Sequence, residues 1–144
     1  RVRSSAASDV YKRQIQKYPQ KEEYQKLVEA DRINLYEREA EKGDDRKFLE
    51  ETDRVFKENL KGDPAWKLYE RKLVYLESKQ PDTSREFERF LKKYPKVMDA
   101  YVEYSIYLCR NNKMTQAQRV YREGRKRTGM TSKRAEELRR KLGL

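Results

Sequence analysis

The feature that most constrains the fold of this chain is a pair of helical patterns that recurs along it. The letters Leu-Tyr-Glu-Arg at residues 35–38 return unchanged at residues 68–71, one helix-turn-helix length later. A second pattern places an aromatic side chain at Phe56, Phe87 and Tyr121. Because a single helix pair of this kind cannot cover its own apolar face, the repetition predicts stacked units in which each pair shields its neighbours.

Prolines, glycines and capping residues divide the chain into helices. Between them, apolar residues recur at spacings of three and four, and no segment alternates as a strand would, so we expect an all-α fold. Thr83 and Thr115 each stand three residues before Glu or Gln, the spacing of a capping box. The expected helices lie at about 21–42, 45–61, 64–80, 83–94, 96–110, 115–128 and 132–142.

Residues 1–14 do not share this pattern. The stretch SSAASDVYKRQ at residues 4–14 carries no helical stripe of apolar residues. Back-translated with one codon choice for each residue, it resembles a sequencing-library adaptor read in frame. We therefore exclude residues 1–14 from the fold, as one excludes a processing segment, and expect them to be disordered. On this hypothesis the natural chain is the C-terminal part of a longer protein.

The remaining chain divides into repeats and a cap. We expect residues 15–129 to hold three helix-turn-helix repeats, at residues 21–61, 64–94 and 96–128. Residues 130–144 would form one further helix, whose apolar side covers the end of the third repeat. A helical bundle in which the repetition is accidental is the structural alternative.

The third repeat resembles a tetratricopeptide repeat. The residues at the tetratricopeptide spacing are Tyr101, Tyr104, Ser105, Leu108, Ala117, Tyr121 and Gly124. In the second repeat, Phe-Glu-Arg-Phe-Leu at residues 87–91 is more similar to the second helix of a half-a-tetratricopeptide (HAT) repeat. The HAT family tends to carry Glu where this chain has Ala40, Leu73 and Leu108, so both branches of the superfamily stay open.

This resemblance covers roughly residues 21–129. It implies an α-solenoid of antiparallel helix hairpins that serves as a binding scaffold, with the first helix of each repeat lining the ligand face. HAT proteins commonly scaffold RNA-processing assemblies, so the resemblance also implies an RNA-linked context, although it does not by itself imply direct contact with RNA.

On the ligand face, eight residues between the core positions would meet a partner, and four of them are basic. Such a groove would suit an acidic or carboxylate-terminated peptide, because Arg can pair with a carboxylate through two hydrogen bonds. The alternative is that these cations only keep the protein soluble. The groove candidates are Asn34, Arg38, Lys67, Arg71, Tyr75, Val102, Ile106 and Arg110.

Positive charge is concentrated in the last quarter of the chain, whose formal net charge as a whole is +11. Contacts to phosphate need little more than such a density of Lys and Arg, and tyrosines between them could stack on bases. Direct binding of RNA or another polyanion is therefore the alternative function. Its candidates are Arg119, Arg122, Arg125, Lys126, Arg127, Arg139 and Arg140.

The composition argues against catalysis. The chain has no histidine, which removes the usual general base and the commonest metal ligand. Its single cysteine, Cys109, has no expected acid–base partner and suits a structural position. The glycines form no phosphate-binding loop. We expect a non-catalytic chain without cofactor or metal, whose partner is a protein, a peptide or a ribonucleoprotein.

The composition also limits the size of the hydrophobic core and indicates the cellular compartment. Hydrophobic residues make up 35% of the chain and charged residues 42%, yet it holds eleven tyrosines, which favours a thin aromatic core over disorder. No apolar run is long enough to span a membrane. A single cysteine fits a reducing compartment, so we expect the protein inside the cell, in the cytoplasm or the nucleus.

Overall fold

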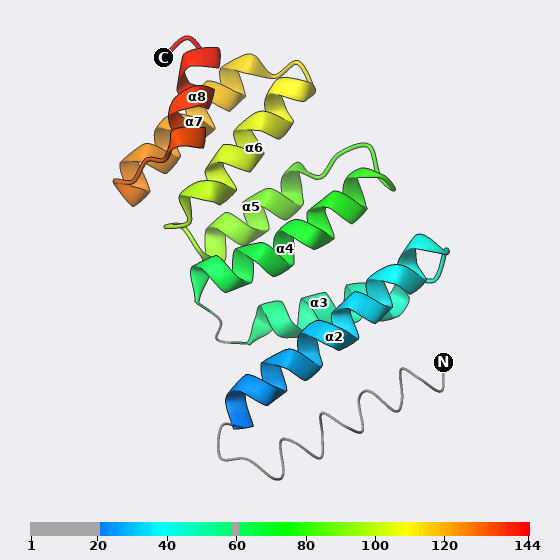
Figure 1. Ribbon diagram of the computed structural model, residues 1–144. Helices are drawn as coiled ribbons and strands as arrows, with labels where there is room; N and C mark the ends of the chain where they lie inside the picture. Colours follow the sequence, from blue (N-terminus) through cyan, green and yellow to red (C-terminus); the bar gives the residue numbers. More distant parts are fainter. Residues whose placement is uncertain (1–20, 59–60) are drawn as a thin grey trace. The chain divides into compact units, whose positions relative to one another are not determined.

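A computed structural model describes residues 21–58 and 61–144, with side chains from residue 27 onward, so the adaptor-like segment lies outside the described residues. Every regular element in this part of the chain is an α-helix, and the expected all-α fold is confirmed (Figure 1). The helices are α2 (Lys21–Glu41), α3 (Arg46–Lys57), α4 (Gly62–Glu77), α5 (Ser84–Lys93), α6 (Met98–Arg110), α7 (Met114–Thr128) and α8 (Lys133–Lys141).

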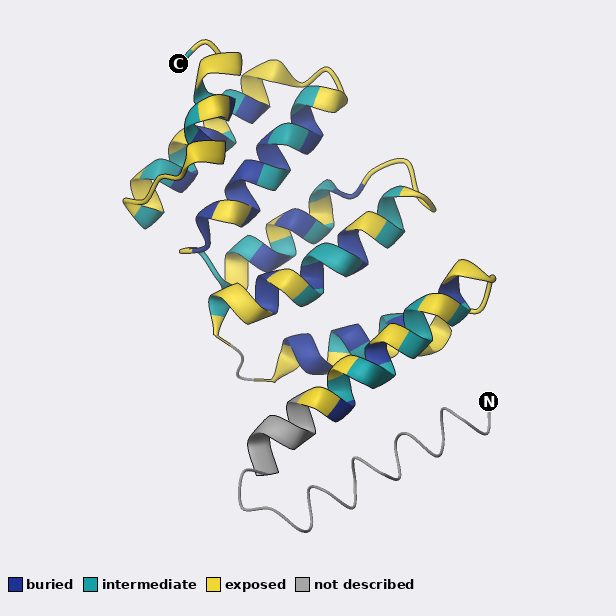
Figure 2. Cartoon of the chain, viewed as in Figure 1, coloured by how far each residue is buried: buried dark blue, intermediate teal, exposed yellow. Residues whose placement is uncertain are grey.

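The chain divides into two compact units, which are described one at a time: an N-terminal unit, Arg1–Lys57, and a C-terminal unit, Glu58–Leu144. In the N-terminal unit, α2 and α3 form an antiparallel pair, since Arg32 pairs with Glu51 at 3.0 Å while Glu29 pairs with Arg54 at 3.3 Å. The apolar stripes of both helices are buried. Their buried side chains are Val28, Ile33, Ala40, Phe48, Thr52, Val55 and Phe56 (Figure 2).

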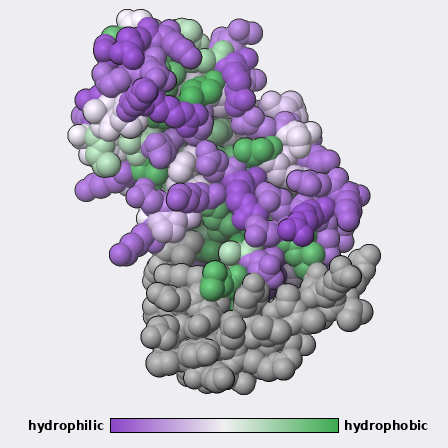
Figure 3. All heavy atoms as spheres, viewed as in Figure 1, coloured by the Kyte–Doolittle hydropathy of each residue, from purple (hydrophilic) through white to green (hydrophobic). Residues whose placement is uncertain are grey.

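Aromatic side chains join the first three helices of the C-terminal unit. Trp66 of α4 meets Phe90 of α5 edge to face, with ring centroids 5.1 Å apart. Phe87 of α5 stacks on Tyr104 of α6 at 4.9 Å, with an interplanar angle of 6°. Such pairs add directional stabilisation to the burial of their rings. The aromatic positions expected for the core therefore form it, while the drawn surface is mostly hydrophilic (Figure 3).

The closest helix contact in the C-terminal unit is between α6 and α7. A Cβ atom on Gly124 would stand 2.5 Å from Cγ of Tyr101, so only glycine allows α7 to pack this near to α6. Helix α7 ends at Gly129, whose φ of +63° is the left-handed conformation that glycine adopts without strain. Helix α8 then buries Ala135 and Leu138, as expected of a covering helix.

The two expected capping boxes do not form. The side chain of Thr83 makes no capping hydrogen bond; instead the Asp82 carboxylate accepts from the Ser84 N–H at 2.9 Å. Helix α7 begins at Met114, before Thr115, and its N-cap Lys113 makes no side-chain cap. Asp82 thus caps the start of α5, and the start of α7 has no side-chain cap, because the expected reciprocal partners are used elsewhere. Glu86 accepts from the hydroxyl of Tyr69, and Gln118 donates to the carbonyl of Leu142.

Candidate functional site: a groove and a basic surface

The groove candidates are divided between the two units. Asn34 and Arg38 lie on α2 in the N-terminal unit, both exposed. The other six belong to the C-terminal unit. Lys67 and Arg110 are exposed there, Arg71, Tyr75 and Ile106 are partly buried, and Val102 is fully buried.

Val102 is the candidate whose placement the structure corrects. It has no exposed surface, because α6 lies between α5, α7 and α8 and buries eight of its thirteen residues. A helix covered on several sides has no narrow apolar stripe, so spacing alone did not separate its core positions from its surface positions. Val102 is a core residue and does not line a groove.

Ion pairs link the first helices of successive repeats within the C-terminal unit. Arg110 of α6 donates to both carboxylate oxygens of Glu77 on α4, each at 3.2 Å. Arg134 of α8 donates to both oxygens of Glu103 on α6, at 2.6 and 2.8 Å. These two-bond pairs hold α4, α6 and α8 in register on one face. Arg110, expected to meet a ligand, therefore already has a carboxylate partner.

A cavity of about 540 Å³ opens on this face, and we name it the α4–α6–α8 groove. Trp66, Met98 and Met130 supply apolar surface, and Met130 is 56% exposed. Of the sequence candidates, Lys67 lines it. The full lining is Asp63, Trp66, Lys67, Glu70, Lys96, Met98, Asp99, Met130, Thr131, Ser132 and Arg134.

The charges around the α4–α6–α8 groove are balanced, which differs from the basic groove expected from the sequence. Three acids and three cations line it. Burial raises the pKa of Glu70 above the usual carboxyl range, and the nearby carboxylates of Glu103 and Asp99 add to this effect, while Arg134 opposes it. A groove with this lining suits a segment that carries both signs of charge as well as an apolar side chain.

The nucleic-acid candidates fall into two groups. Arg125 and Arg139 pair with Glu136 at 3.0 and 3.1 Å, and Arg127 pairs with Glu123 at 2.5 Å. The second group is exposed and makes no ion pair with any described residue. Its members are Arg119, Arg122 and Lys126 on α7 and Arg140 on α8.

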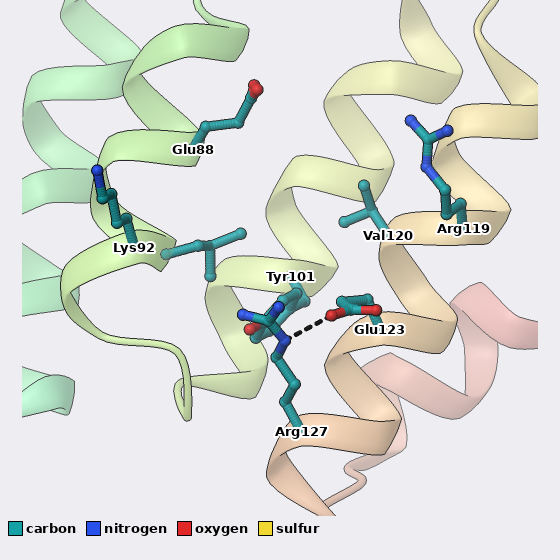
Figure 4. Close-up of a pocket in the computed structure, with 8 residues that line it drawn as sticks. Glu88, Lys92, Tyr101, Arg119, Val120, Glu123 and Arg127 are labelled. Atoms are coloured by element: carbon teal, nitrogen blue, oxygen red, sulfur yellow. Dashed lines mark ion pairs between the residues drawn. The ribbon is translucent and has the colours of Figure 1, made fainter.

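A second cavity, of about 260 Å³, lies between α5 and α7 over α6, and sequence reasoning missed it. Figure 4 shows Glu88 and Lys92 on α5, and Arg119, Val120 and Glu123 on α7, with Tyr101 of α6 between the two helices. We name it the α5–α7 groove; Leu91 and Arg127 complete its lining. The spacing of residues in the sequence does not predict this cavity, because its walls come from α5 and α7, which are brought near each other only by folding.

Two further groups bear on chemistry. Burial raises the pKa of the Cys109 thiol, so the nucleophilic thiolate is disfavoured there. Lys72 is buried between α4 and α5, where its ammonium lies 3.4 Å from a carboxylate oxygen of Glu86. Glu86 also accepts a hydrogen bond from the Tyr69 hydroxyl, so the three side chains form a structural cluster between α4 and α5.

The part of the chain that the structure describes holds no cluster of acidic or cysteine side chains arranged for a metal ion. None of its helices is long and apolar enough to cross a membrane.

Comparisons with protein-family models, with curated proteins and with solved structures found no match for this chain. Within each unit, helices that follow one another in the sequence pack together, α2 on α3 in the first and α4 to α7 in turn in the second, which is compatible with a helical-repeat fold. The tetratricopeptide and HAT resemblance stays a prediction from the sequence.

Proposed function

We propose that this chain is a non-catalytic protein-interaction scaffold of the tetratricopeptide or HAT type that binds a partner peptide or helix in the α4–α6–α8 groove. The observation that carries the proposal is the groove itself, a hollow of about 540 Å³ lined by α4, the start of α6, and α8 with the loop before it. Grooves between helices commonly receive an extended or helical segment whose side chains provide the anchors.

The lining of the groove indicates the chemistry of the partner. Met130 is exposed and offers a flexible apolar contact, which adapts to a bound side chain, whereas Met98 is buried beneath the groove. Lys67 and Lys96 make no ion pair with another described residue, so they are free to meet carboxylates of the partner. Asp63 and Asp99 lie in the same lining and favour a nearby basic residue. A mixed-charge segment with one apolar anchor therefore fits better than a uniformly acidic one.

Two exposed methionines provide a matched test. Met130 lines the groove, whereas Met114 at the start of α7 is similarly exposed, at 48%, and lies outside the lining. Peptides would be selected on the full chain by display and their affinities measured by fluorescence anisotropy. We expect Met130→Asp to weaken the selected peptides at least about tenfold, or about 1.4 kcal/mol, and Met114→Asp to leave them unchanged. Equal effects of the two substitutions would contradict the proposal.

RNA binding is the second candidate function, because α7 carries a row of unpaired cations. Arg119, Arg122 and Lys126 follow one another at helical spacing, are exposed, and have no acidic partner among the described residues. A row of this kind could contact successive phosphates. Binding driven by phosphate contacts would lose affinity steeply between roughly 50 and 200 mM salt, which separates it from a peptide anchored by apolar contacts.

A further inference from the structure

The α5–α7 groove combines an apolar interior with a charged rim, and the proposed function does not use it. Leu91 on α5 and Val120 on α7 are both partly exposed and contribute the apolar walls. Its volume is about 260 Å³. Because an apolar protein cavity of about 150 Å³ is large enough to bind benzene, this groove has room for a leucine or phenylalanine side chain.

The floor of the groove is firmly held. Tyr101 is 2% exposed, and its hydroxyl donates to the carbonyl of Pro95 at 2.7 Å. Gly124 packs directly against the ring of Tyr101 from α7, so ring and helix restrain each other. A site built on such a restrained floor loses little conformational freedom when a ligand enters.

The rim is positive once its internal ion pair is taken into account. Glu123 and Arg127 neutralise each other at 2.5 Å, as the dashed line in Figure 4 shows. Lys92 and Arg119 stand on opposite walls, exposed and without an ion pair to any other residue that the structure describes. Glu88 is the one remaining acid of the lining.

The charge beyond the rim has the same sign. On α7 the row of exposed cations continues from Arg119 to Arg122 and Lys126, one helical turn after another. A ligand over Val120 would meet Lys92 on one wall and Arg119 on the other, and Arg122 and Lys126 add positive charge nearby on α7. This arrangement complements a segment with an apolar side chain between acidic ones.

We propose that the α5–α7 groove is a second docking site, which binds an acidic amphipathic segment of a partner protein. One leucine or phenylalanine of that segment lies between Leu91 and Val120 over Tyr101, and carboxylates before and after it pair with Lys92 and Arg119. A nucleic acid would use the same cations but would leave the apolar walls unfilled, so the walls favour a peptide.

Two designed, fluorescein-labelled peptides test this inference on the full chain. One is a glutamate-rich helix of fifteen residues with two leucines at a spacing of four; the other replaces both leucines by alanine. We expect the leucine peptide to bind at least about tenfold more tightly than the alanine peptide in anisotropy titrations at about 150 mM salt. A lysine-rich peptide with the same leucines should bind at least as weakly as the alanine peptide.

Variants locate the binding. Val120→Glu should reduce the affinity of the leucine peptide at least about tenfold, whereas Val74→Glu, at a 67% exposed valine of α4 outside both groove linings, should not. Because Val120 is partly buried, thermal melting by circular dichroism accompanies each variant. Arg119→Glu, at an exposed position, provides a second test with little risk to the fold and should also weaken binding severalfold.

The outcomes distinguish this site from the others. Loss of binding with Val120→Glu and with Arg119→Glu, together with normal melting, supports the inference. Binding that responds only to Met130→Asp would assign the peptide to the α4–α6–α8 groove, which overturns this inference and supports the proposed function. Equal affinity for the leucine and alanine peptides, or binding of oligouridylate but of neither peptide, would overturn it as well.

Discussion

Arginines on two sides of the C-terminal unit behave differently. On the face of α4, α6 and α8, Arg110 and Arg134 each hold a glutamate that lies one repeat earlier in the chain, 33 and 31 residues away. On α7, Arg119 and Arg122 are exposed and unpaired with any residue within the described ranges. The first pair of arginines links α4, α6 and α8 to one another, and the second pair is available to a partner.

This difference shows why net charge alone does not locate a binding surface. The chain is strongly basic, but the cations on the first-helix face are largely compensated by nearby acids. A row of exposed cations without an ion pair to any described residue lies on α7, at Arg119, Arg122 and Lys126. Removing the paired Arg110 or Arg134 should therefore affect stability, whereas removing an unpaired cation of α7 should affect binding.

The strongest test of the first-helix face is Trp66→Ala. The ring is 4% exposed, packs on Phe90 and also forms part of the α4–α6–α8 groove. Removing so large a buried ring should cost about 3–5 kcal/mol of unfolding free energy. Urea titration followed by circular dichroism measures the loss. An unchanged midpoint would show that Trp66 is not part of the core.

On the other side of the unit, Gly124→Ala tests the contact between α6 and α7. The added methyl group would stand 2.5 Å from Tyr101, so overpacking should cost about 1–3 kcal/mol. The same substitution in a Tyr101→Ala background should cost clearly less, because the clashing ring is gone. Additive losses in this double-mutant cycle would mean that the two residues do not touch.

The contrast between paired and unpaired arginines predicts a smaller difference. Arg134→Ala should lower the unfolding free energy by up to about 1 kcal/mol, since the lost pair is partly exposed. Arg122→Ala should change it by less than about 0.5 kcal/mol, because no ion pair of the described chain is lost. Thermal melting at low and high salt compares them, and only the effect of Arg134→Ala should shrink with salt. A larger effect of Arg122→Ala would reverse the assignment of the two groups.

The smallest expected effect is on the pH dependence of stability. The hydrogen bond from the Thr131 hydroxyl, followed by that from Arg139, lowers the pKa of Glu136. Its stabilising contribution is therefore present above the unfolded value of about 4.3 and is lost as the pH falls through the lowered pKa.

The pKa shift of Glu70 has the opposite direction to that of Glu136. Its raised pKa favours the folded chain at low pH, and this contribution is lost as the pH rises through the raised value. Melting from pH 3 to pH 7 should thus show a flatter acid limb for Glu136→Gln and a slightly higher melting temperature near neutrality for Glu70→Gln. Parallel curves for the two variants would contradict the difference between their environments.

Much of the fold could be predicted from the sequence. Prolines and glycines end helices through local geometry, so the positions of the helices follow from residues such as Gly129 without knowledge of the tertiary structure. The aromatic core was also predictable, because Trp66 with Tyr69 and Tyr101 with Tyr104 stand three residues apart, which is helical spacing. These features depend on neighbours a few residues away.

The binding surfaces were less predictable, because they depend on contacts about one repeat apart. Spacing places Arg110 between core positions, but whether Glu77 reaches it depends on how α4 and α6 pack. Val102 was placed on the surface because nothing local shows that α6 is covered on several sides. The α5–α7 groove appears only once Gly124 brings α7 onto Tyr101.

The central claim is that this chain binds protein segments and not nucleic acid. The most direct test is an anisotropy titration of the full chain with fluorescein-labelled single-stranded RNA at roughly 50 and 200 mM salt. We predict weak binding at low salt that disappears at the higher concentration, since Tyr121, the tyrosine of α7, is buried and cannot stack on bases. Tight binding that survives the higher salt would contradict it and would make α7 an RNA-binding surface.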